Sequence, residues 1–233
     1  MRSTRRPARA SATPAGHPLP ALRAVSFRLF AGEIVALLGP SGSGKTSLLN
    51  VLVGWERPDS RSVRWWLEDG GPDSWQQVGI VPQRLGLLEE LTVKENVAWP
   101  LRLAGVPSRY AHELQRRLGL AGLAARFTDE ISLGEQQRAA IARALVLRPR
   151  LVIADEPTSH QDEQSAAAVL DAFEDAREGG ATALIATHDV SILATADRLI
   201  RIVDGRVGSP LERGQGYGAG GMDLPGGLDA SPS

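Results

Sequence analysis

The feature that most limits what this chain can fold into is a short apolar run followed at once by a glycine-rich loop. Residues 34–38 read Ile-Val-Ala-Leu-Leu, and such a run is typical of a strand buried on both faces of a parallel sheet. Residues 39–46 then read Gly-Pro-Ser-Gly-Ser-Gly-Lys-Thr, and a helical pattern occupies 46–53. Glycines let backbone N–H groups approach a polyphosphate closely, and the helix start adds donors and partial positive charge. The stretch therefore predicts a strand, a phosphate-binding loop and a helix.

The spacing of this loop, with Gly-Lys-Thr four residues after the first glycine, is that of a P-loop. We expect Lys45 to neutralise the β- and γ-phosphates of a nucleotide and the Thr46 hydroxyl to bind Mg²⁺. A plain glycine-rich turn is the alternative, but the strand before the loop and the helix after it favour the nucleotide site. The predicted nucleotide-binding residues of the loop are Gly39, Ser41, Gly42, Ser43, Gly44, Lys45, Thr46 and Ser47.

Length and composition exclude several classes of protein. The 233 residues suit one domain with an inserted subdomain, and 42% hydrophobic with 23% charged residues is ordinary for a soluble globular chain. A net charge of −1 argues against recruitment by bulk charge to nucleic acid or to an anionic membrane. The chain has no cysteine, which excludes disulfides and Cys-ligated metals. No apolar run approaches the roughly 20 residues that cross a bilayer, so work at a membrane would need another chain.

The two ends of the chain differ in composition from its middle. Residues 1–20 are rich in Arg, Ala and Pro, and residues 208–233 are rich in Gly and Pro, so both are predicted to be disordered tails. A basic arm that touches lipid and a transit peptide are alternatives for the first tail. Apolar residues alternate over 22–30 and again over 63–67, which predicts half-buried strands of an N-terminal antiparallel β subdomain.

The rest of the chain predicts alternating helices and strands. Capping boxes at Thr92 and Ser132 start helices, a further helix begins near 107, and a short one is expected at 120–127. We interpret 89–131 as a helical insertion between two strands. Later elements are a helix capped by Asp162 or Ser159, apolar strands at 151–154 and 181–186, and a hairpin at 199–207 with Asp204-Gly205 at its turn. Together these indicate an α/β fold: a P-loop NTPase parallel-sheet core, an N-terminal antiparallel β subdomain and an inserted α-helical subdomain.

Chemically capable side chains follow the strands at 151–154 and 181–186. Asp155 and Glu156 come directly after the first strand, and His188 comes just after the second. Because parallel strands bind ligands at their carboxyl ends, we expect these groups beside the P-loop. Asp155 would hold Mg²⁺, Glu156 would act as general base toward a water in line with the γ-phosphate, and His188 would reach that phosphate or orient Glu156. Solvent-facing acids and a surface histidine are the alternative.

Gln83 follows a short apolar strand at 78–81, and its amide could contact Mg²⁺ or the attacking water; a surface glutamine is the alternative. The predicted metal ligands are Thr46, Gln83 and Asp155. The predicted catalytic residues are Glu156, His188, Lys45 and Gln83.

Six motifs in this order give the chain, over about residues 21–207, a resemblance to the nucleotide-binding subunit of an ABC transporter. They are Gly39-Pro-Ser-Gly-Ser-Gly-Lys45-Thr46, Val81-Pro-Gln83, Ile131-Ser-Leu-Gly-Glu-Gln-Gln-Arg138, Leu151-Val-Ile-Ala-Asp155-Glu156-Pro-Thr, Ser159-His-Gln-Asp162 and Ala186-Thr-His188-Asp189. Residues 91–101 and 154–158 further resemble the lipoprotein-release and macrolide-export branch.

The resemblance implies an ATPase with ATP and Mg²⁺ as its cofactors. In this family two subunits stack head to tail, with ATP between one P-loop and the partner's signature helix. It implies that Ser132, Gly134 and Glu135 bind the nucleotide of a second copy and that Asp162 lies at the dimer contact. It further implies that Gln83 senses the nucleotide at the place where an integral membrane permease docks. The chain would then be cytoplasmic and held on the inner face of the membrane by that permease. No nucleic-acid partner is expected.

Three departures from the family pattern affect this expectation. Leu133 stands where the signature usually has Gly, and its β-carbon would crowd the opposing phosphate. Glu135 replaces the usual Gln, a mild change because glutamate completes the capping box. No aromatic residue that could stack on adenine precedes Phe27, and His17 is a poor substitute.

Three functions fit the resemblance. The leading one is an ATPase that energises a separately encoded export-type permease, and the alternative is an ATP-gated regulatory dimer that signals through a membrane protein without moving substrate. A soluble ABC-type ATPase acting on DNA or ribosomes is disfavoured, because those relatives carry long coiled coils or two cassettes and this sequence has one P-loop. A kinase or small GTPase is disfavoured further, because neither uses the element at 132–138 and no Asn-Lys-x-Asp guanine site is present.

Overall fold

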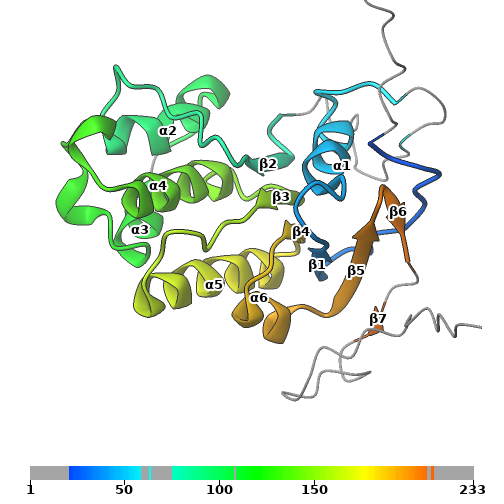
Figure 1. Cartoon of the computed structure of the whole chain (residues 1–233). Helices are drawn as coiled ribbons and strands as arrows, with labels where there is room; N and C mark the ends of the chain where they lie inside the picture. Colours follow the sequence, from blue (N-terminus) through cyan, green and yellow to red (C-terminus); the bar gives the residue numbers. More distant parts are fainter. Residues whose placement is uncertain (1–20, 59–62, 64–74, 108, 209–210, 213–233) are drawn as a thin grey trace, which may run out of the picture.

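A seven-stranded sheet runs through the part of the chain that this computed structural model describes, which is residues 21–58, 63, 75–107, 109–208 and 211–212. The strand order is β2-β3-β4-β1-β5-β6, and β7 also pairs with β5 (Figure 1). The first five strands in this order are parallel, and β6 and β7 are antiparallel to β5. The strands are β1 (Ile34–Leu38), β2 (Val78–Val81), β3 (Leu151–Asp155), β4 (Thr182–Ala186), β5 (Arg198–Val203), β6 (Arg206–Val207) and β7 (Leu211–Glu212).

The register of these strands decides where the chemistry lies. Ala186 at the end of β4 pairs with Leu37 of β1 and with Asp155 of β3, and Ala154 pairs with Val81 at the end of β2. The carboxyl ends of β1, β2, β3 and β4 therefore lie level at one edge of the sheet, as the sequence predicted.

Both faces of the sheet are covered, and almost every residue of β1, β3 and β4 is buried. On one face α1 (Lys45–Leu52) packs with half-buried side chains from residues 22–29. On the other face lie α4 (Leu133–Leu145), α5 (Glu163–Glu178) and α6 (Val190–Thr195), so that α1 and α5 appear on opposite sides of the strands in Figure 1. Successive strand residues belong to alternate clusters, as the pleat requires.

The helical insertion contains α2 (Val93–Ala104) and α3 (Arg109–Arg117), which gather beside α4 at one end of the molecule (Figure 1). The prediction of a helix at 120–127 is wrong, because that stretch holds only a 3₁₀ turn, η2 (Ala121–Leu123). A second 3₁₀ turn, η3 (Thr128–Glu130), follows it. Gly119 has a positive φ of 68° and ends the preceding helix, and Gly122 weakens the next turn. The parallel core with an inserted helical subdomain is confirmed.

Residues 22–30 show the predicted period of two in burial but no strand. Val25, Phe27 and Leu29 are half-buried while the residues between them are exposed, yet no ladder forms along this segment. Of the predicted strand at 63–67, only Val63 lies within the described residues. The first tail, 1–20, also lies outside them, and the second tail contains β7, which pairs with β5 and so is not wholly without structure.

The last part of the chain holds one confirmed and one missed element. The hairpin predicted at 199–207 forms from β5 and β6, and Asp204 and Gly205 at its turn have positive φ values of 48° and 72°, as a type I′ turn requires. Helix α6 was not predicted; it has six residues, too few to show a helical period, and is capped by Asp189. Among all described residues, no helix combines the length and the apolar character that crossing a bilayer demands.

Candidate active site

The P-loop is held rigidly between the sheet and the turn of the β5–β6 hairpin. A Cβ added at Gly39 would collide with the Ile202 carbonyl oxygen, and one at Gly44 would lie 2.7 Å from the Ala21 carbonyl oxygen. Gly44 also has a φ of 102°, which glycine alone adopts readily. The backbone N–H of Gly205 donates to the Ser43 carbonyl at 2.9 Å. The glycines are thus required both by the loop's conformation and by its tight packing.

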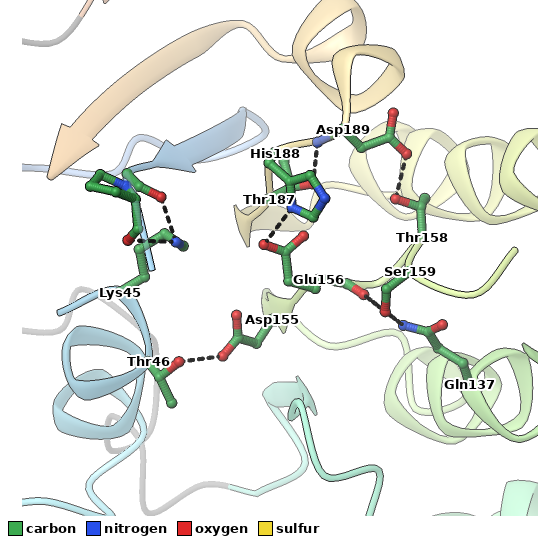
Figure 2. A network of polar contacts seen from close by, with 12 residues as sticks. Lys45, Thr46, Gln137, Asp155, Glu156, Thr158, Ser159, Thr187, His188 and Asp189 are labelled. Carbon is green, nitrogen blue, oxygen red and sulfur yellow. Dashed lines mark hydrogen bonds and ion pairs between the residues drawn. The ribbon is translucent and has the colours of Figure 1, made fainter. Parts of the chain in front are cut away.

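Lys45 is the cation of this loop. Its Nζ donates to the Gly39 carbonyl at 2.6 Å and to the Pro40 carbonyl at 3.3 Å, so the ammonium lies folded over the loop it belongs to (Figure 2). These are bonds that phosphate oxygens can replace, because an ammonium prefers a charged acceptor. The buried Ser43 hydroxyl has no partner within the described residues. A loop with a cation and a spare buried hydroxyl fits a phosphate ligand.

Thr46 and Asp155 meet across 109 residues of sequence. The Thr46 hydroxyl donates to Asp155 Oδ2 at 2.8 Å. Burial raises the pKa of Asp155 above its ordinary value, and the nearby carboxylate of Glu156 adds to the rise, whereas the Thr46 hydrogen bond and Lys45 oppose it. A buried carboxylate beside a hydroxyl is the set of hard oxygen ligands that Mg²⁺ prefers, and the cation would stabilise the ionised form. The donor set therefore fits the predicted metal.

Glu156 and His188 form the second pair at this edge. His188 Nδ1 lies 3.0 Å from Glu156 Oε1, and Figure 2 shows this pair between Asp155 and Asp189. The Glu156 side chain is 20% exposed and that of His188 is 84% exposed. An open cavity of about 310 Å³ adjoins them, lined by Glu156, Thr158, Ser159, His188, Asp189 and Val190. A carboxylate with an imidazole neighbour beside an open space is suited to polarising a water molecule.

The backbone of Glu156 is in an unusual conformation that its surroundings support. Its φ is 51°, which costs energy for a residue with a β-carbon. Its carbonyl accepts from Gln137 Nε2 at 2.6 Å and from Ser159 Oγ at 2.8 Å, and its N–H donates to the Ala186 carbonyl at 2.8 Å. Backbone strain that several hydrogen bonds support is typical of a functional position. Sequence reasoning missed Gln137, because no sequence pattern links it to a carbonyl 19 residues away.

The remaining predicted residues lie apart from this cluster. Ser132 caps α4, exchanging hydrogen bonds with Glu135, which lowers the pKa of Glu135. Gly134 is buried beneath the loop after β3, where an added Cβ would lie 2.7 Å from the His160 carbonyl oxygen. Asp162 caps α5 by accepting from the Ser165 N–H at 2.8 Å.

Gln83 follows β2 at the level of the other strand ends, where its side chain is exposed. The described hydrogen bonds do not join it to the carboxylates.

Comparison with known proteins agrees with this geometry. The family described as "ABC transporter" matches residues 22–159, more than half of the chain. The chain belongs to the ABC transporter ATP-binding family. This ABC ATP-binding domain is 43% identical over 202 residues to the lipoprotein-releasing system ATP-binding protein LolD of Maricaulis maris, covering 81% of this chain and 88% of that protein. It is 38% identical over 216 residues to the cell division ATP-binding protein FtsE of Mycobacterium tuberculosis, covering 88% and 92%.

A solved structure resembles the ABC domain with a TM-score of 0.74 and 31% identity, covering 82% of this chain and 90% of the other. It is described as the dimeric ATP-binding cassette MJ0796 in a post-hydrolysis state, bound to ADP and Pi. The predicted family, fold and ATPase activity are confirmed, and the nucleotide is ATP. His17, considered from the sequence as a poor stacking partner for adenine, lies outside the described residues.

Proposed function

We propose that this chain is the ATP-hydrolysing subunit that energises a separately encoded, export-type membrane permease. The observation that carries the proposal is the row of paired groups at one sheet edge, Thr46 with Asp155 and Glu156 with His188, beside the P-loop. The name of the relative from Maricaulis maris, a lipoprotein-releasing system, supports the export direction. We expect the chain at the cytoplasmic face of the membrane, held there by the permease.

Each residue has a separate part in the proposed reaction, in which water attacks the γ-phosphorus and ADP leaves. The P-loop amides and Lys45 bind the phosphates. Mg²⁺ would be held by Thr46 and Asp155, with the Gln83 amide reaching it when nucleotide is bound, and would supply charge stabilisation for the phosphates. Glu156 takes the proton of the attacking water, and His188 orients Glu156.

A second copy of the chain would complete the site. Ser132, Gly134 and Glu135 lie at the start of α4, where a helix N-terminus attracts an anion. In a head-to-tail pair this segment would meet the γ-phosphate bound by the other copy, with Asp162 at the contact. The dimeric state of the cassette with ADP and Pi supports this arrangement. Hydrolysis would then remove the group that joins the two copies, giving a switch between closed and open dimers.

Glu156→Gln is the decisive variant for this proposal. The amide keeps the size of the side chain but cannot accept the proton, so ATP binding should persist while turnover falls at least about a hundredfold. A stable ATP-bound dimer should then accumulate, which size-exclusion chromatography with light scattering would detect. Glu178→Gln, at the exposed last residue of α5 and so at the far end of that helix from Asp162, is the matched control and should leave turnover and the monomer–dimer balance unchanged. A monomer at every ATP concentration would contradict the sandwich.

A second candidate function has one observation in its favour. The relative from Mycobacterium tuberculosis is named for cell division rather than for transport, which supports an ATP-gated dimer that signals through a membrane protein. Two experiments distinguish transport from signalling. A membrane partner is first captured by affinity purification from detergent-solubilised membranes. ATP-dependent release of a lipid-linked substrate is then measured in vesicles that contain the captured partner. Capture of a membrane partner with no ATP-dependent substrate movement would favour signalling. Neither function involves a nucleic acid.

A further inference from the structure

The pairing of Glu156 with His188 raises the question of what holds the two residues together. They follow different strands, β3 and β4. Past the last paired position, Asp155 with Ala186, the Glu156 N–H still donates to the Ala186 carbonyl at 2.8 Å, and the two segments then leave the sheet. The imidazole gains little from packing, because the side chain of His188 is 84% exposed. A single contact of 3.0 Å between an exposed ring and a carboxylate would hold only weakly by itself.

Besides the Glu156–His188 contact, a hydrogen bond connects the loop after β3 directly to the residues before α6. The Thr158 hydroxyl donates to Asp189 Oδ2 at 2.6 Å (Figure 2). Thr158 lies two residues after Glu156, and Asp189 comes directly after His188, so this bond closes a ring that contains the Glu156–His188 contact. Thr158 is only 7% exposed, which fixes its hydroxyl and shields the bond from water.

Asp189 is itself fixed from three sides. Its Oδ1 accepts from the N–H and the hydroxyl of Ser191, capping α6, and its own N–H donates to the buried Thr187 hydroxyl at 2.9 Å. Although burial opposes it, the hydrogen bonds from Ser191 and Thr158 lower the pKa of Asp189, so the acceptor remains ionised near neutral pH. The carboxylate therefore ties the loop that carries Glu156 to the start of α6.

We propose that the Thr158–Asp189 hydrogen bond positions His188 against Glu156 for the hydrolysis step. Both are positioning residues that act through His188, and this inference rests on the roles proposed above for Glu156 and His188. When the bond is absent, the loop after β3 and the residues before α6 lose this link, and the fraction of molecules with the imidazole against the carboxylate falls. Nucleotide binding, which uses the P-loop on the other side of Asp155, is unaffected. The expected signature is a lower kcat with an unchanged KM for ATP.

Thr158→Val tests the bond with a side chain of the same shape. Misplacement of a catalytic group by a fraction of an ångström should lower kcat about tenfold, measured as phosphate release by the full-length chain at saturating ATP and Mg²⁺. Thr158→Ser, which keeps the hydroxyl, should restore most of the rate. The matched control is Thr182→Val at the opposite end of β4, because Thr182 is 8% exposed and its hydroxyl donates to the Phe30 carbonyl at 3.0 Å. The control should lower the Tm similarly without changing kcat.

A double variant shows whether Thr158 acts through His188. In a His188→Ala background, Thr158→Val should lower kcat no further, whereas a merely structural defect would add its full effect. If Thr158→Val does not fold, Asp189→Ser takes its place, since serine still caps α6 but cannot reach Thr158. A fully active, folded Thr158→Val, or additive effects in the double variant, would overturn the positioning role. If His188→Ala alone hydrolyses ATP at full rate, the role of His188 fails, and the positioning role fails with it.

Discussion

The two regions of this ABC domain that we propose to bind phosphate are built in opposite ways. At the catalytic edge, the hydrogen bonds join separate elements: Thr46 of α1 reaches Asp155 of β3, and the loop after β3 reaches His188. At the start of α4, the capping bonds stay within one turn, between Ser132 and Glu135. The first region is assembled by the fold of one chain, whereas the second presents its helix N-terminus outward, which suits a site completed by another copy.

The two regions are nevertheless connected through two glutamines, since Gln137 of α4 also donates to the Glu156 carbonyl. Gln161 Nε2 donates to the Gly134 carbonyl at 2.9 Å, and Gln161 Oε1 accepts from Arg138 Nη1 at 2.7 Å. Gln161 lies in the same loop as Thr158, six residues after Asp155. A displacement of this loop would therefore be transmitted to the start of α4, so the proposed change on hydrolysis has a direct path between the regions.

Lys45→Ala should break the catalytic edge most completely. It removes the cation that lies folded over the loop, and ATP turnover should fall at least about a hundredfold, as when a donor aimed at developing charge is lost. Steady-state phosphate release measures this. Lys94→Ala, which removes the only other lysine of the sequence on the exposed side of α2, should leave turnover unchanged. An active Lys45→Ala would mean that the P-loop does not bind the phosphates as proposed.

Asp155→Asn should separate stability from function within the catalytic edge. Because burial raises the pKa of Asp155, its ionised form destabilises the fold at neutral pH. The stability contributed by the protonated form is fully present below the pKa of Asp155 in the unfolded chain. It is lost as pH rises through the higher pKa of Asp155 in the folded protein. The neutral amide should therefore raise the Tm of the nucleotide-free protein at pH 7 by a few degrees while weakening Mg²⁺-dependent hydrolysis.

The difference in Tm should shrink as pH falls through the raised pKa of Asp155, because the wild-type carboxyl then also becomes neutral. Differential scanning calorimetry across this range gives the comparison. Asp171→Asn, at an exposed position of α5, is the control and should show no such gain at pH 7. An unchanged or lower Tm for Asp155→Asn at pH 7 would mean that the hydrogen bond from Thr46 compensates the buried charge.

Local chemistry explains why much of the fold could be predicted from the sequence. The capping boxes at Thr92 and Ser132 form with Glu95 and Glu135 as predicted, because their partners lie three residues apart. Strands made almost entirely of apolar residues could also be recognised, because their pattern is local in the sequence. Asp155 could be placed at the P-loop edge because parallel strands end together, and its contact with Thr46 agrees with that placement.

What the sequence could not predict depends on contacts between distant segments. Residues 22–30 have the period of a strand, but a strand also needs a paired neighbour, which a period cannot specify. The short helix α6 and the bond from Thr158 to Asp189 depend on where two loops meet after leaving the sheet. Gln137 gives the same lesson, since a glutamine within an amphipathic helix carries no sign of the carbonyl it will bind.

Leu133→Gly tests the second region, the start of α4, and should have the smallest effect of these variants. Leu133 is the first residue of α4 and is 49% exposed, so its side chain projects from the surface that the proposed dimer would close. If its β-carbon crowds the phosphate of the facing copy, removing it should tighten ATP-driven dimerisation of the Glu156→Gln protein several-fold, or about 1 kcal/mol. Leu133→Ala, which keeps the β-carbon, should change little.

Sedimentation equilibrium with ATP measures the Kd of this dimer. Leu103→Gly, at a 61% exposed position near the end of α2, controls for the cost of a glycine in a helix. A weaker dimer for Leu133→Gly would instead make Leu133 an apolar contact between the copies. An unchanged Kd would place this side chain clear of the nucleotide, leaving the helix N-terminus itself as the whole of the second phosphate site.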